Sequence, residues 1–165
     1  MRTLCKKGCI IWSSIMPVDN SILNDLKKTV EDLQNAINNS IQESISQNNQ
    51  VILELQTQEQ MYQGIDSKGI DIKPAYAAST IKIKRRKGQP TDRVTLFDSG
   101  EFYKSLEVIA GKNDAIIRTI ISYSVFLVNK YADILGLDEE NWTVFLEKYT
   151  IPTIKKNFDD IIAKS

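Results

Sequence analysis

The sequence contains no histidine among its 165 residues. Histidine is the side chain that most often acts as a general base near neutral pH and that most often binds transition metals. Its absence excludes serine–histidine and cysteine–histidine nucleophile systems. Chemistry based on carboxylates, lysine or tyrosine stays open, although no spacing of these residues singles it out.

Cysteine is almost as scarce, because Cys5 and Cys9 are the only two. Two thiolates are too few for a structural zinc site without further ligands. A disulfide between them would constrain only a short loop at one end of the chain. We therefore interpret both residues as free thiols in a reducing compartment, and we expect neither a metal nor a cofactor.

Long apolar runs and net charge are also missing. No stretch approaches the roughly 18 apolar residues of a membrane span, so we expect no membrane partner. Residues 1–16 join a basic start to a short apolar run without a signal-peptide cleavage pattern, and we treat them as an N-terminal extension. An alternative is that Met16 is the true start. Basic and acidic residues number 21 each, so contact with nucleic acid requires a local patch.

Residues 21–47 show the clearest helical pattern. Their apolar residues recur at spacings of three and four, and they are Ile22, Leu26, Val30, Leu33, Ile37, Ile41 and Ile45. This spacing predicts a long amphipathic helix that ends near Asn48 and Asn49. We expect its narrow stripe to pack on one partner surface as the first helix of an α+β domain. A coiled coil is the alternative.

The centre of the chain is rich in turns. The segment 50–57 alternates in a way that predicts a strand, and 62–74 predicts a turn or hairpin. Residues 76–87 suit a helix by composition and a strand by alternation. Residues 92–98 read as an extended segment, after which Ser99 is expected to cap a short helix.

The rest of the chain predicts a hairpin and helices. Two β-branched runs within 106–122 flank the turn 111–114 and predict a β-hairpin. A short helix over 124–137 and a longer one that starts after Asp138 follow, and Pro152 should kink or split the longer helix. We therefore expect residues 17–165 to form a single α+β domain, with the long N-terminal helix packed on a small antiparallel sheet and with C-terminal helices.

The strongest local charge feature is a basic run. It consists of Lys82, Lys84, Arg85, Arg86 and Lys87, and Arg93 follows it. One interpretation is contact with the phosphate backbone of nucleic acid, and the other is a solvated surface. No aromatic residues are interleaved to stack on bases, and no nucleic-acid-binding motif is present.

Other candidate chemistry has a simpler explanation. The glycines do not form a phosphate-binding loop. Acidic residues of the central region lack a common spacing, and turn or cap roles account for each of them: Asp66, Asp71, Asp92, Asp98 and Glu101. Phe102 and Tyr103 are adjacent, so on a helix they point about 100° apart. We expect one to enter the core and the other to face a neighbouring protein.

The segment LFDSGEFYKS, Leu96 to Ser105, resembles the L-x-x-[TS]-G-x-[LF]-x-x-S signature of tail-completion and virion-morphogenesis proteins of tailed bacteriophages. It matches at Leu96, Ser99, Gly100, Phe102 and Ser105. A long N-terminal helix, and then Tyr, Thr and Lys ahead of the signature, are similar to the family pattern. The resemblance covers residues 17–125 in outline. Ser99 stands where threonine is commoner, and the chain beyond Tyr131 lies outside the pattern.

The resemblance implies a structural virion protein rather than an enzyme. Such neck or tail-end proteins act as ring subunits that join head and tail, so the implied partners are copies of the chain and other phage neck, tail or portal proteins. The implied location is the virion, after assembly in the cytoplasm of the bacterial host. In such a ring, a loop from Lys82 to Arg93 would face passing DNA or the next ring.

Two other functions stay open. The first is a nucleic-acid-associated accessory protein that binds DNA through the basic segment 82–87. The second is an enzyme with carboxylate chemistry, which the missing histidines and the scattered acidic residues disfavour.

Overall fold

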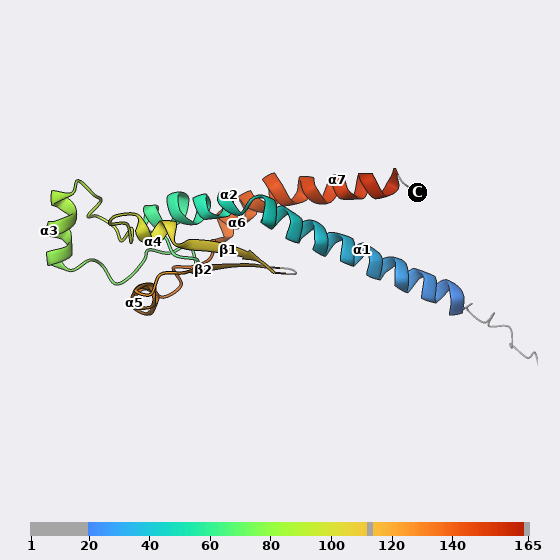
Figure 1. Cartoon of the computed structure of the whole chain (residues 1–165), viewed down its shortest axis with the longest axis horizontal. Helices are drawn as coiled ribbons and strands as arrows, with labels where there is room; N and C mark the ends of the chain where they lie inside the picture. Colours follow the sequence, from blue (N-terminus) through green and yellow to red (C-terminus); the bar gives the residue numbers. More distant parts are fainter. Residues whose placement is uncertain (1–19, 112–113, 164–165) are drawn as a thin grey trace, which may run out of the picture. The chain divides into compact units, whose positions relative to one another are not determined.

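The computed structural model describes residues 20–111 and 114–163. The expectations for the extension 1–16, Met16, Cys5 and Cys9 lie outside these residues, as does the centre of the turn 111–114. The chain divides into two compact units, residues 1–35 and 36–165, and each is described by itself below. Figure 1 shows the order of the helices and strands along the chain.

The first helix, α1 (Asn20–Gln47), confirms the predicted long helix and its end. The helix is less buried than expected, because its apolar stripe was predicted to pack on one partner surface along its length. Within residues 20–35 the apolar stripe is exposed, and Val30 keeps 60% of its surface accessible. Only the C-terminal part of the helix enters a core, where Ser40, Ser44 and Ile45 are buried.

The strand predicted for residues 50–57 is wrong. These residues form α2 (Asn49–Glu54) and the π-helical turn η1 (Leu55–Gln60), which the 3₁₀ turn η2 (Met61–Gln63) continues. Ile52 packs in one core cluster and Leu53 against the other. A helix that is covered on two sides carries apolar residues all round, and this hides its period in the sequence.

Two buried glutamines hold this helical segment to a distant part of the chain. Gln56 donates to the Ile134 carbonyl at 3.0 Å and accepts from the Gly136 N–H at 2.8 Å. Gln60 donates to the Gly136 carbonyl and accepts from the Asp138 N–H, both at 2.8 Å. Each buried amide is thereby satisfied at both ends, as buried polar groups require.

The turn-rich middle is as predicted, and the segment after it contains a helix. Ile65 and Asp71 pair in an isolated antiparallel bridge. Residues 76–87, which suited either structure, contain α3 (Ala78–Arg86). Residues 92–98 form no strand pair, and the backbone turns at Leu96 with φ of 52°.

The hairpin is confirmed. Strands β1 (Leu106–Ala110) and β2 (Ala115–Thr119) pair antiparallel, with Leu106 opposite Thr119 and Ala110 opposite Ala115. They lie side by side after the single turn α4 (Glu101–Lys104) (Figure 1). In the described part of the chain they form the whole sheet. The fold class is therefore α+β, with a long N-terminal helix, a small antiparallel sheet and C-terminal helices.

The C-terminal part contains α5 (Ser124–Lys130), α6 (Glu139–Phe145), the π-helical turn η3 (Leu146–Thr150) and α7 (Ile151–Ile162). Helix α5 ends earlier than predicted, because Tyr131 and Ile134 turn into the core. Asp138 caps α6 as predicted and accepts from the Asn141 N–H at 2.8 Å. Helical backbone continues from α6 through η3 into α7, and Pro152, which has no N–H to donate, is the second residue of α7, directly after the π-helical turn.

The core consists of two clusters of buried side chains. The first joins the middle of the chain to α4 and the segment after α5, and contains Met61, Ile72, Val94, Phe102, Tyr103, Leu106, Tyr131 and Ile134. The second joins the end of α1 to α2 and α6 through Ile45, Ile52 and Phe145. Partly buried residues of β1 and β2 pack on the second cluster, and α2 contributes to both.

Candidate functional site

The segment that matches the signature forms a tight bend over residues 94–105, which we call the corner. Leu96 has left-handed backbone angles, which cost a non-glycine residue roughly 1–2 kcal/mol. The Tyr76 hydroxyl accepts hydrogen bonds from the N–H groups of Thr95 and Leu96, both at 2.9 Å. Two successive N–H groups thus converge on one oxygen, an arrangement that favours this bend.

Gly100 closes the bend and begins α4. Its φ is 85°, and a Cβ at this position would lie 3.3 Å from a ring carbon of Phe97. Glycine alone avoids both the strain and the contact. The Ser99 hydroxyl accepts from the Glu101 N–H at 3.4 Å, which is long for such a bond. Gly100 therefore occupies the cap position, and the predicted capping by Ser99 is weak.

The other signature side chains point into the protein. Phe102 and Tyr103 keep only 4% and 8% of their surface exposed, so the expectation that one would face a neighbouring protein is wrong. The Tyr103 hydroxyl donates to the Thr95 carbonyl at 2.5 Å, and burial raises the pKa of Tyr103 far above its usual value. The Ser105 hydroxyl donates to the Phe102 carbonyl at 2.6 Å and shares a hydrogen bond with Thr119 of β2.

Lys84 joins α3 to the corner. Its ammonium donates to the Phe97 carbonyl at 2.6 Å and to the Gln89 side chain at 3.2 Å, and lies 4.8 Å from the centre of the Tyr76 ring. Only 5% of the residue is exposed. The interpretation of Lys84 as part of a solvated or DNA-facing surface is therefore wrong. Neutral oxygens and an aromatic face stabilise its charge.

The remaining basic residues divide into two groups. Lys87 pairs with Asp98, and Arg93 donates to the Tyr62 carbonyl at 3.0 Å. The exposed basic residues of α3 with no ion pair in the described part of the chain are Lys82, Arg85 and Arg86. Their spacing of three and four places them on one side of α3, away from Lys84. The expected loop from Lys82 to Arg93 is thus a helix followed by an anchored segment.

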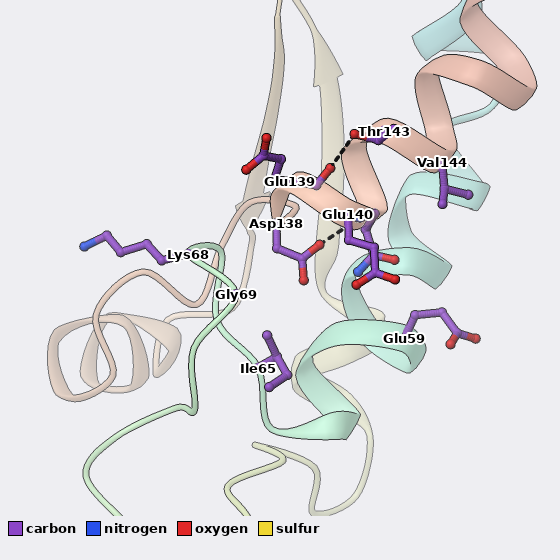
Figure 2. Close-up of a pocket in the computed structure, with 10 residues that line it drawn as sticks. Glu59, Ile65, Lys68, Gly69, Asp138, Glu139, Glu140, Thr143 and Val144 are labelled. Carbon is purple, nitrogen blue, oxygen red and sulfur yellow. Dashed lines mark hydrogen bonds between the residues drawn. The ribbon is translucent and has the colours of Figure 1, made fainter.

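A hollow of about 760 Å³ lies between α6, η1 and the segment 65–69 (Figure 2). Glu59, Glu139 and Glu140 line it together with Asp138, whose carboxylate caps α6. Lys68 lines it too but pairs with Asp133 at 2.6 Å, a contact that raises the pKa of Lys68. Acidic residues are favourable at the start of a helix, and this accounts for Asp138, Glu139 and Glu140 at the start of α6.

The structure adds two residues to the candidate site that sequence reasoning had missed. The Tyr76 hydroxyl accepts from the N–H groups of Thr95 and Leu96, and the Thr95 carbonyl accepts from the Tyr103 hydroxyl. The available signal for Tyr76 was the tyrosine that precedes the signature in the family pattern, whereas the threonine of that pattern lies before residue 91 and is not Thr95. The positions of Tyr76 and Lys84 along the chain do not reveal that both side chains contact the corner.

Among residues 20–111 and 114–163, no helix is both long and apolar enough to cross a membrane. Within the same residues, no group of three or more histidine, cysteine, aspartate or glutamate side chains is placed to hold a metal ion. Comparison of the chain with models of known protein families, with curated proteins and with solved structures finds no match.

Proposed function

We propose that this chain is a structural, non-catalytic virion protein of a tailed bacteriophage, a neck or tail-completion ring subunit that joins head and tail. Its partners are then copies of itself and other phage neck, tail or portal proteins. It is assembled in the cytoplasm of the bacterial host and ends in the virion. The resemblance of residues 96–105 to the family signature is the origin of this proposal.

The observation that carries the proposal is the structural role of the signature residues. Gly100 permits the left-handed bend, and Phe102 fills the core. Ser105 joins α4 to the hairpin through Phe102 and Thr119. A short pattern whose residues determine backbone shape and packing is what a rigid assembly subunit requires, and their polar groups are engaged within the chain.

The experiment is to purify the full chain and examine it by mass photometry and negative-stain electron microscopy. We expect closed rings, because head-to-tail contacts between identical subunits must close on themselves to give a defined particle. Mass spectrometry of purified phage particles should also detect the chain. A strictly monomeric protein that is absent from particles would refute the proposal.

Nucleic-acid binding is a second candidate, and one observation favours it. Lys82, Arg85 and Arg86 form an exposed face of α3 without ion pairs in the described residues. Changing all three to alanine should abolish duplex DNA binding, which in the wild type should weaken by up to about three logarithmic units per tenfold increase in salt. The matched control is a triple change of Lys27, Lys28 and Lys104. Equal loss in both variants, or binding that survives the first, would exclude this face.

A further inference from the structure

The exposed apolar line of α1 follows a heptad. Leu23, Leu26, Val30, Leu33 and Ile37, which we call the seam, are spaced three, four, three and four residues apart. This is the a–d spacing of a coiled coil, in which one helix presents its apolar line to another. The seam residues keep between 37% and 60% of their surface exposed.

The same line continues into a helix–helix interface within the chain. The next two a–d positions are Ser40 and Ser44, and both are buried. Ser44 shares a hydrogen bond with Thr150 at 3.2 Å, and Ser40 accepts from the Asn157 side chain of α7 at 3.0 Å. On this line of α1 the positions at Ser40 and Ser44 are small, polar and buried, whereas the seam residues are large, apolar and exposed.

We infer that the seam is covered by α1 of a second copy of this chain. Two copies of one a–d line are complementary, because each supplies both the knobs and the holes. Pairing residues 20–37 of two copies along about 27 Å of helix removes on the order of 1,000 Å² from water. That area is at the lower end of specific interfaces, so the pair should dissociate in the micromolar range.

The charges beside the seam favour a protein partner over a lipid surface. Residues 20–37 contain Asp25, Lys27, Lys28, Glu31 and Asp32, a net charge of −1 from three acidic and two basic residues. Helices that lie on membranes instead carry a polar face rich in lysine and arginine. Mixed charge suits the solvated outer face of a paired helix.

The test measures the mass of the full chain by sedimentation equilibrium over roughly 1–100 µM, a range chosen around the expected affinity. We compare the wild type with Leu26→Glu/Val30→Glu. The matched control is Asn24→Glu/Asn35→Glu, which adds the same charge to exposed positions on the opposite side of α1. We expect a mass that rises with concentration for the wild type and the control, and at least a tenfold weaker association for the seam variant.

Two outcomes would overturn the inference: a monomeric wild type, whether or not it binds phosphatidylcholine vesicles through the seam, and a seam variant that associates like the wild type. At concentrations where the wild type is monomeric, thermal unfolding of both variants should match that of the wild type, because the changed residues are exposed in the single chain. Rings that persist in the seam variant would refute the pairing and leave the proposed function standing. Dimers that do not form rings would support the pairing and refute the proposed function.

Discussion

The hydroxyl of Tyr76 offers the most direct test of the corner. Tyr76→Phe deletes the oxygen that accepts from Thr95 and Leu96, each at 2.9 Å. The ring remains, and with it the face beside which the Lys84 ammonium lies. The substitution therefore removes one acceptor of two hydrogen bonds and leaves the apolar packing almost unchanged.

The magnitude follows from the burial of the two donors. Thr95 is fully buried, so water cannot replace the lost acceptor, whereas Leu96 is half-buried. An unsatisfied buried donor costs about 1–3 kcal/mol, and a partly exposed one less. We expect a loss of about 2–4 kcal/mol in the free energy of unfolding, which for a chain of this size lowers Tm by about 5–15 °C.

The assay is urea denaturation followed by circular dichroism, with thermal unfolding alongside. Tyr149→Phe is the matched control, because Tyr149 is half-buried and its hydroxyl has no hydrogen bond among the described residues. The control should change the free energy of unfolding by less than about 0.5 kcal/mol. Equal effects of the two substitutions would show that the Tyr76 hydroxyl does not hold the corner.

Further substitutions test other contacts through the same unfolding assay. Lys84→Met should destabilise by about 1.5–3 kcal/mol, because the Phe97 carbonyl loses a charged donor, while Arg85→Met on the exposed side of α3 should be nearly neutral. Gly100→Ala should cost more than Gly69→Ala, since both have positive φ but only Gly100 has a neighbour within 4 Å of the added Cβ. Asp138→Ala should cost about 1 kcal/mol through loss of the α6 cap, and no loss of helix stability would contradict that role.

Local patterns predicted much of the fold. The spacing of Ile22 to Ile45 predicted α1, and Asp138 predicted the start of α6. The β-branched runs around the turn 111–114 predicted the hairpin. These features depend on residues close together in the chain, where side-chain periodicity, capping and turn chemistry act over a few positions. Fold class followed from them.

The failures share one cause, which is contact between distant residues. Gln56 and Gln60 bind a backbone segment nearly 80 positions later, and this stabilises a helix where alternation predicted a strand. The basic run shows the same effect at the candidate site. Lys84 bonds to the Phe97 carbonyl, whereas Arg85 beside it is exposed. Adjacent residues of one charge thus have opposite roles, and the direction of each side chain decides which.

The sequence by itself determined that this is an α+β chain with a long amphipathic helix, a hairpin and no histidine chemistry. Tertiary structure decided that Phe102 and Tyr103 both enter the core, that Tyr76 and Lys84 hold the corner, and that the seam of α1 is exposed. Periodicity reports which side of an element is apolar, because it depends only on spacing along the chain. Whether another part of the molecule covers that side depends on where distant segments lie, and local spacing does not encode this.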